Sequence, residues 1–213
     1  MSYEFTNDWF GTTGRYIWDA MLPKFKPTNI LEVGSFEGRS ACYFIDTLAK
    51  KDKTPIELHC IDTWKGGEDH EGIDMADVKS RFYRNIDIAI TNARVRGAEA
   101  IVQVYNSTSE DQLCELFPSY KDYFDFIYID GSHRADDVLS DAVNAFRLLR
   151  PGGIMCFDDY LWHWADRPYN PIDTPKAAID AFTMIYAQKL QVLALPPSQL
   201  FIEKNKEKQH GNN

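Results

Sequence analysis

Hydrophobic residues along the chain form short continuous runs, separated by longer segments with helical spacing. Strands buried on both faces lack polar alternation, so the continuous runs predict parallel strands at 30–33, 55–61, 98–104, 124–129 and 154–157. Apolar positions three or four residues apart predict helices at 13–25, 75–93, 135–149 and 174–188, and another helix opens at Ser40. Two last runs, 190–195 and 200–203, predict an antiparallel hairpin. The pattern therefore predicts a doubly wound, Rossmann-like, mostly parallel seven-stranded α/β sheet with helices on both faces.

The length of 213 residues suits one domain with a sizeable core, so we expect a single domain over 1–213. An N-terminal helical segment, 1–28, precedes the first strand. A polar tail, 204–213, follows the hairpin and is expected to fray.

The first predicted strand runs into a glycine turn, E-V-G-S-F-E-G-R-S, and then into a helix. Gly34 and Gly38 predict the floor of a binding crevice, because glycine allows close approach of a ligand to the backbone. A dinucleotide turn would read G-x-G-x-x-G, but Phe36 stands at the second glycine position. Glu32 and Glu37 would repel a pyrophosphate and attract an ammonium or a sulfonium. The turn favours S-adenosylmethionine over NAD; a turn that only packs a helix onto the sheet is the alternative.

Polar residues follow the second and third predicted strands. Asp62 ends the second strand about 20–30 residues after the glycine turn, where an acidic residue accepts hydrogen bonds from ribose hydroxyls. A turn or helix cap is the other interpretation of Asp62. Ser107, three residues before Glu110, fits a capping box and lies where a side chain can reach an adenine edge.

Three carboxylates follow the fourth and fifth predicted strands. Asp130 comes after the fourth strand, and Asp158 and Asp159 come after the fifth. Ligands of doubly wound sheets bind at the carboxyl ends of strands, so these side chains converge if the two strands are neighbours. Carboxylates that close repel one another unless a cation holds them, which predicts Mg²⁺, with Mn²⁺ or Ca²⁺ next. The alternative is an Asp-Gly turn and a helix cap.

Together these motifs resemble a class I S-adenosylmethionine-dependent methyltransferase over 30–160. They are E-V-G-S-F-E-G-R-S, C-I-D-T-W, Y-I-D-G-S-H and L-R-P-G-G leading to F-D-D-Y. The closest resemblance is to macrolide and aminocoumarin sugar O-methyltransferases, with catechol O-methyltransferases as more distant relatives. The resemblance implies Mg²⁺ on Asp130, Asp158 and Asp159. The candidate cofactor-binding residues are Glu32, Gly34, Ser35, Gly38, Ser40, Asp62, Thr63, Trp64, Ser107 and Asp130.

Two histidines are candidates for the base that deprotonates an acceptor hydroxyl. The catechol enzymes carry a lysine shortly after the fourth-strand aspartate, and this chain has His133 near that position. The sugar enzymes carry a histidine soon after the Asp-Asp pair, and His163 comes slightly later than that. A vicinal diol would suit two open metal positions, so we expect a sugar, polyol or catechol as the small-molecule acceptor. The aromatic loop 160–169 fits an acceptor cover, a dimer contact or core equally well.

Charge and composition limit the kinds of partner that the protein is expected to bind. The formal charge of −9, with scattered basic residues, argues against a nucleic-acid partner. Four well-separated cysteines, no signal segment and no apolar run of membrane length predict a cytoplasmic protein without a membrane partner. The sequence leaves a homo-oligomer open. It also leaves open a metal-independent methyltransferase, a non-catalytic S-adenosylmethionine-binding protein and a nicotinamide reductase.

Overall fold

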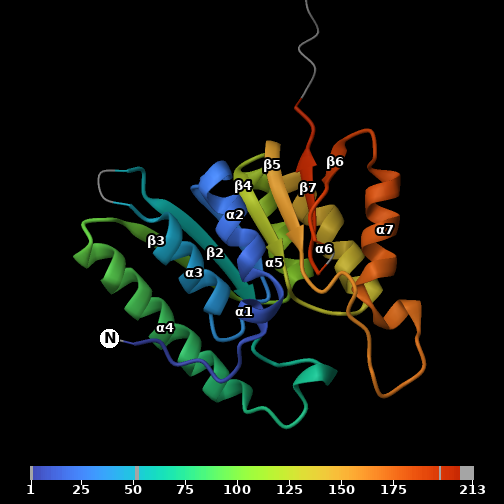
Figure 1. Ribbon diagram of the computed structural model, residues 1–213, viewed down its shortest axis with the longest axis horizontal. Coiled ribbons are helices and arrows are strands. Elements are labelled where there is room, and N and C mark those ends of the chain that lie inside the picture. The colour runs from blue at the N-terminus through green and yellow to red at the C-terminus, as the bar shows by residue number, and fades with distance from the viewer. Residues whose placement is uncertain (1, 51–52, 197, 207–213) are drawn as a thin grey trace, which may run out of the picture.

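The computed structural model describes residues 2–50, 53–196 and 198–206. It contains one seven-stranded sheet with the strand order β3-β2-β1-β4-β5-β7-β6 (Figure 1). The strands are β1 (Asn29–Val33), β2 (Ile56–Asp62), β3 (Ala100–Asn106), β4 (Phe124–Ile129), β5 (Leu149–Phe157), β6 (Leu190–Leu193) and β7 (Leu200–Lys204). β1 to β5 pair in parallel, whereas β7 runs antiparallel to both β5 and β6. This confirms the predicted Rossmann-like fold class and the C-terminal antiparallel hairpin.

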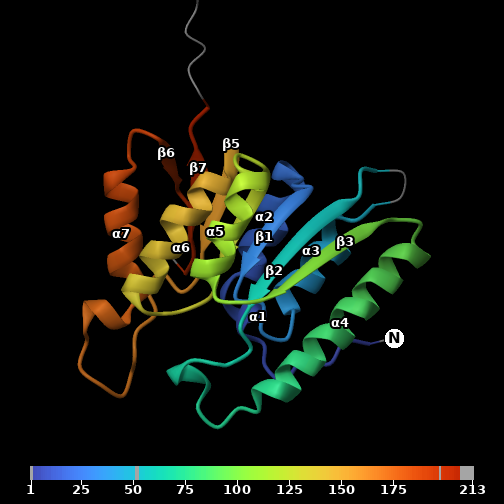
Figure 2. The same ribbon diagram turned by 180° about the vertical axis from the view of Figure 1, so that it is seen from behind.

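Helices cover both faces of the sheet. One face carries α2 (Arg15–Phe25), α3 (Arg39–Leu48) and α4 (Met75–Val95), as Figure 1 shows. The opposite face carries α5 (Ser109–Tyr120), α6 (Ala135–Leu148) and α7 (Pro175–Ile185), which lie in front in Figure 2. The short helix α1 (Trp9–Thr13) lies at the edge where the parallel strands end.

Alternating side chains of the strands divide the core into two clusters. On β4, Phe126 and Tyr128 face α2 and α3, whereas Ile127 and Ile129 pack against α6 on the other side. All four are buried. β4 is thus apolar on both faces, as expected for a strand covered by helices on both sides.

Three local expectations differ from the structure. The helix expected at 13–25 is α2, which begins at Arg15, and the short helix α1 before it was not expected; a Cβ at Gly14 between the two would lie 2.2 Å from Nε2 of Gln199. The stretch 150–153, expected to separate a helix from the fifth strand, is instead a bulge inside β5, because the pairing with β4 shifts there and Gly152 takes a φ of +77°. The cap of α5 is Thr108, one residue after Ser107, since its hydroxyl accepts the N–H of Asp111.

The expected frayed tail falls mostly on 207–213, outside the described residues, although Lys204 itself belongs to β7. Cys42, Cys60 and Cys156 are buried thiols, as the apolar surroundings predicted, and Cys114 is exposed. Within the described residues, no helix has both the length and the apolar character needed to cross a bilayer.

Candidate cofactor and metal site

The glycine turn after β1 is packed tightly against its neighbours. Gly34 has a φ of +84°, and a Cβ there would lie 1.9 Å from the carbonyl oxygen of Asp130. The Gly34 N–H donates to the carbonyl of Ile61 at 2.9 Å. Gly38, with a φ of +78°, precedes α3. Only glycine fits the first of these positions, so the turn forms a close floor between β2 and β4.

Glu32 is fully buried beneath this turn. The hydroxyls of Ser35 and Ser40 both donate to its carboxylate. Burial raises the pKa of Glu32 to about 7, although the two serine hydrogen bonds act in the opposite direction. Ser35 and Ser40 therefore orient Glu32 at the base of the turn.

Asp62 holds the same turn from β2. Its Oδ2 accepts the N–H groups of Ser35 at 2.9 Å and Phe36 at 2.8 Å, and its Oδ1 accepts the N–H of Trp64 at 2.6 Å. The Trp64 side chain is buried, donates from Nε1 to the Phe36 carbonyl at 2.9 Å, and packs on Phe82 of α4. Asp62 thus caps the glycine turn, which was the alternative interpretation of this residue, and ribose binding by Asp62 stays a prediction. Trp64 supports the turn from the core.

The ends of β2 and β3 lie side by side. Asn106 donates from Nδ2 to the carbonyl of Thr63 at 2.9 Å. Ser107 is half-buried directly after β3. The structure therefore brings Thr63 and Ser107 to the same edge of the sheet as Asp62, because parallel strands end on one side.

Glu37 does not face the crevice as the sequence argument assumed. Its buried carboxylate accepts from Arg81 Nε at 2.6 Å, and from the N–H and hydroxyl of Thr6 at 2.8 and 2.7 Å. Arg81 of α4 thus neutralises this charge, and Thr6 of the N-terminal segment hydrogen-bonds to it. The electrostatic argument against a pyrophosphate is correspondingly weaker than the turn sequence suggested.

Asp130, Asp158 and Asp159 converge at the ends of β4 and β5. One carboxylate oxygen from each lies within 4.8 Å of the others. The pairing of Tyr128 with Cys156 places Asp130 beside Asp158, two residues further along, as expected for neighbouring strands. The pKa values of Asp130 and Asp158 are both raised, first by burial and then by the repulsion among the three carboxylates.

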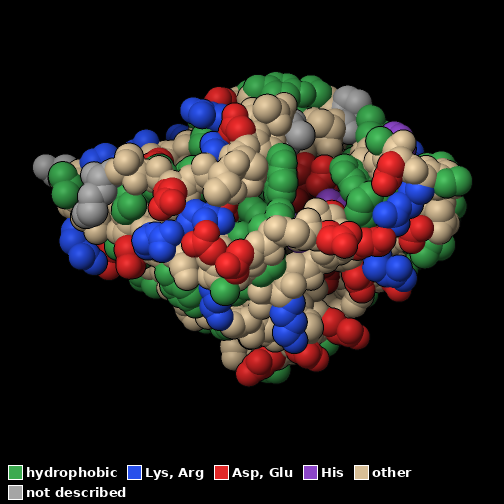
Figure 3. Space-filling model, turned by 90° about the horizontal axis from the view of Figure 1, so that it is seen from below, with side chains coloured by type: hydrophobic (Ala, Val, Ile, Leu, Met, Phe, Trp, Pro, Cys, Tyr) green, Lys and Arg blue, Asp and Glu red, His purple; other side chains and the backbone are tan. Residues whose placement is uncertain are grey.

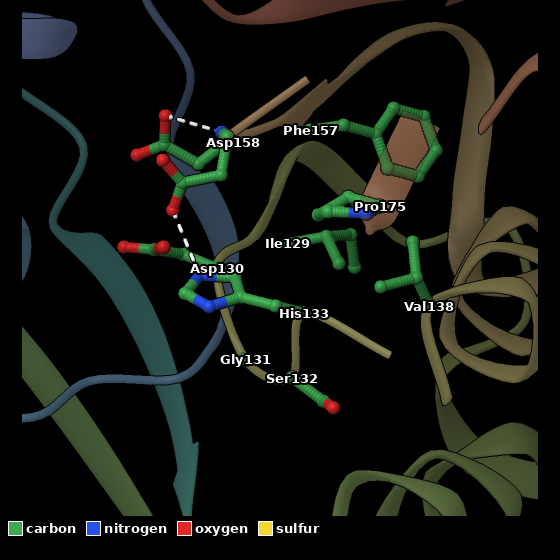
Figure 4. A pocket seen from close by; sticks show the side chains of 10 residues that line it. Ile129, Asp130, Gly131, Ser132, His133, Val138, Phe157, Asp158 and Pro175 are labelled. Carbon is green, nitrogen blue, oxygen red and sulfur yellow. Dashed lines mark hydrogen bonds and ion pairs between the residues drawn. The ribbon is translucent and has the colours of Figure 1, made fainter. Parts of the chain in front are cut away.

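His133 points at these carboxylates, as Figure 4 shows. Its Nε2 lies 3.0 Å from Oδ2 of Asp159, and its Nδ1 lies 3.7 Å from Oδ2 of Asp69. The ring stacks on Trp162 with centroids 4.1 Å apart. Burial lowers the pKa of His133, but the hydrogen bond to Asp159 and the neighbouring negative charges outweigh burial and raise it.

His163 lies elsewhere. It is exposed, and its described contacts are with Leu161 and Tyr169 and not with the three aspartates. The structure brings one of the two candidate bases, His133, to the acidic cluster. Asp69, which faces His133 from the 63–74 loop, was not singled out from the sequence, because an acidic residue in a polar loop carries no distinguishing pattern.

The acidic cluster opens into a pocket with one polar and one apolar side. Gly131, Ser132 and His133 continue the polar side from the aspartates, and the apolar lining comes from Ile129, Val138, Phe157 and Pro175 (Figure 4). Figure 3 looks onto the face where the parallel strands end; acidic side chains and a histidine lie there in a hollow between hydrophobic side chains. The hollow lies at the strand edge where doubly wound sheets bind ligands.

The donor set fits a hard divalent cation. All three groups are carboxylates, and their oxygens are close enough to share one ion. The pKa values of Asp130 and Asp158 are raised by burial and by carboxylate repulsion, and a bound cation would oppose both effects. The arrangement suits Mg²⁺ or Mn²⁺ better than a metal that prefers sulfur or nitrogen ligands.

The sheet order, the glycine turn and the acidic residue ending β2 define a Rossmann-like α/β protein of the class I methyltransferase type. The model of the methyltransferase domain family matches residues 31–160, and the chain belongs to this family. This confirms the family expected from the motifs. No curated protein matches the chain.

Three solved structures show the same fold. An O-methyltransferase from Bacillus cereus in complex with SAH has a TM-score of 0.63 and 16% identity, covering 97% of this chain and 84% of that one. The O-methyltransferase TomG from Streptomyces achromogenes in complex with SAM has a TM-score of 0.59 and 16% identity, covering 89% and 78%. A Corynebacterium glutamicum protein has a TM-score of 0.56 and 22% identity, covering 88% and 76%.

Proposed function

We propose that the protein transfers a methyl group from S-adenosylmethionine to a hydroxyl oxygen of a small acceptor, with Mg²⁺ held by Asp130, Asp158 and Asp159. The observation that carries this proposal is the convergence of the three carboxylates beside His133, at the edge of the sheet that also holds the glycine turn. The Bacillus and Streptomyces enzymes, which have the same fold, were solved with SAH and SAM.

The cofactor site would run from the glycine turn to the end of β3. The methionine part would lie over the turn that contains Gly34 and Gly38, and Glu32 lies beneath this turn. Asp62 keeps one free lone pair, on Oδ1, for a ribose hydroxyl while it accepts three backbone N–H groups. Thr63 and Ser107 flank the adenine side.

The reaction is an in-line displacement: the acceptor oxygen bonds to the methyl carbon, the carbon–sulfur bond breaks, and the sulfonium becomes a neutral thioether. When bound, Mg²⁺ would coordinate the acceptor hydroxyl and lower its pKa. His133 is the residue we assign to receive the hydroxyl proton, because its imidazole lies against Asp159 and lines the pocket. Asp159 and Asp69 hold the imidazole between them.

We assign the acceptor to the class of sugars, polyols and catechols. Two adjacent hydroxyls can bind one cation together. Trp162, stacked on His133, and Trp164, with its ring 4.9 Å from that of Trp162, supply aromatic surface beside the cluster for a ring-shaped acceptor.

Calorimetric titration with S-adenosylhomocysteine, in EDTA and again with excess Mg²⁺, tests the proposal first. Wild type should bind in the micromolar range, and Asp62→Ala should bind far more weakly. Methyl transfer to sugar and catechol acceptors should disappear in EDTA and in Asp158→Asn, and return when Mg²⁺ is restored to wild type. Absence of cofactor binding in both buffers would refute the methyltransferase proposal.

A metal-independent methyltransferase is the second candidate. It is favoured by one observation: Asp159 already has a protein partner in His133, so the pair can act as a base without a cation. Full activity in EDTA combined with loss of activity in His133→Gln would decide for this mechanism.

A further inference from the structure

A buried layer of side chains lies behind Asp158. Tyr128 donates its hydroxyl to Oδ2 of Asp158. Trp18 of α2 packs edge-on against Tyr128 with ring centroids 4.7 Å apart, and its Nε1–H donates to Oε1 of Gln199 at 2.8 Å. Tyr128 and Trp18 are fully buried, and Gln199 is 1% exposed. The layer joins α2, β4 and the residue before β7 to one member of the acidic cluster.

Only one end of the Gln199 side-chain amide, its Oε1, is hydrogen-bonded by this layer. Among the described residues, its buried Nε2 has no acceptor at hydrogen-bond geometry. The same side chain interacts with Asp158, and this interaction opposes the rise in the pKa of that carboxylate. Gly14 makes the space, since a Cβ there would lie 2.2 Å from Nε2. A buried amide donor without a partner is costly, so its position beside a carboxylate calls for an explanation.

We propose that Tyr128 and Gln199 are positioning residues that hold the Asp158 carboxylate in the orientation that completes the cation site, with Trp18 fixing Gln199 from α2. The inference rests on the proposed function, because it assumes that the acidic cluster binds a divalent cation. It adds residues from outside the cluster and gives α2 a part in metal binding.

The hydrogen bonds to Asp158 restrict the rotation of its carboxylate. Tyr128 donates to Oδ2, and the backbone N–H of Asp159 donates to Oδ1 at 2.9 Å. Each carboxylate oxygen keeps a second lone pair for a cation. Groups that hydrogen-bond metal ligands typically change metal affinity about 10- to 100-fold when they are removed.

The Tyr128 hydroxyl has no evident packing role. Phe126, two residues earlier on the same face of β4, fills its part of the core without a polar atom. A buried hydroxyl carries a desolvation cost that only a hydrogen bond offsets. Asp158 is the acceptor of that hydrogen bond.

The test measures Mn²⁺ affinity from the electron paramagnetic resonance signal of the free ion, with S-adenosylhomocysteine present at saturation. Tyr128→Phe should weaken Mn²⁺ binding about tenfold or more, and Gln199→Met should weaken it in the same direction. Both variants should keep the affinity of wild type for S-adenosylhomocysteine, which a general loss of structure would not allow.

Tyr123→Phe is the matched control. It also removes a hydrogen bond from a tyrosine to a carboxylate, since Tyr123 donates to Oε2 of Glu57 at 2.7 Å, but it does so away from the cluster. Its Mn²⁺ affinity should equal that of wild type.

The outcomes separate the two proposals. If wild type binds no Mn²⁺, the proposed metal site is wrong, and this inference is wrong with it. If wild type binds Mn²⁺ and Tyr128→Phe binds it equally well, only the positioning role is overturned. Should Tyr128→Phe fail to fold, Gln199→Met decides by the same measurement, and unchanged affinity in that variant overturns the inference.

Discussion

Asp141 of α6 allows a direct test of how the burial of a carboxyl group changes the stability of this protein with pH. Its residue exposure is 2%, and burial raises its pKa from 3.8 to about 7, although a hydrogen bond with Ser109 acts in the opposite direction. A rise of about three pKa units corresponds to about 4 kcal/mol of unfavourable free energy for the ionised form in the folded protein. Relaxation of the protein around the charge relieves some of that cost. About 4 kcal/mol is therefore the upper bound on the stability that Asp141→Asn gains by removing the ionised form.

The sign follows from proton binding. Between pH 3.8 and about 7 the folded state holds a proton at Asp141 that the unfolded state has lost, so this group makes stability fall as the pH rises. Above pH 7 the full cost is present. Asp141→Asn removes the ionisation. We therefore expect the variant to be more stable than wild type at pH 8, and its advantage to be about 2–3 kcal/mol smaller at pH 5.

Urea unfolding of both proteins at pH 5 and pH 8 measures this difference. Asp125→Asn is the control with the opposite sign. The pKa of Asp125 is lowered, because its hydrogen bonds with Arg150, Thr28 and Asn29 outweigh burial, so it is ionised at both pH values. That variant should lose similar stability at pH 5 and pH 8. An Asp141→Asn effect that does not change with pH would refute the assignment of a raised pKa to burial.

Three further predictions concern the turn, its support and the acceptor. Arg81→Met should destabilise the fold by about 3–5 kcal/mol in urea unfolding, because it leaves the buried Glu37 carboxylate without its cation, and adding Glu37→Gln should recover part of the loss. Gly34→Ala should lower the unfolding temperature and abolish S-adenosylhomocysteine binding, because its Cβ would overlap the Asp130 carbonyl; a stable, binding-competent variant would contradict the close packing. Trp162→Ala should raise the acceptor KM about tenfold without changing cofactor affinity in calorimetry, and an unchanged KM would remove Trp162 from the acceptor site.

The sheet was predictable because its strands are short continuous apolar runs between helical periods, and 124–129 was located to the residue. The ends of other elements were not. The stretch 150–153 carries a proline and two glycines, which indicate a break, but tertiary pairing with β4 keeps it inside β5 as a bulge. Gly14 lies between α1 and α2, and a larger residue there would meet Gln199, a contact that spans most of the chain and leaves no local pattern.

The acidic cluster was predictable for a geometric reason. Residues that directly follow parallel strands lie at one edge, so Asp130 and Asp158 need only neighbouring strands to meet. The direction of Glu37 was not predictable, because its partner Arg81 lies on a helix far along the chain. The layer around Tyr128 was missed for the same reason: a tyrosine within an apolar strand reads as core until its hydroxyl partner is known.

The acidic residues around the crevice differ in whether the protein supplies a partner for their charge. Glu37 is neutralised by Arg81, and Glu32 is held by serine hydroxyls with a raised pKa. Within the described residues, no lysine or arginine forms an ion pair with Asp130 or Asp158, although the protein surface carries many such pairs. Buried carboxylates without a cationic partner are costly in a folded chain. The cluster therefore concentrates negative charge where an ion from solution would relieve it, which is why metal affinity is the property most directly linked to its geometry.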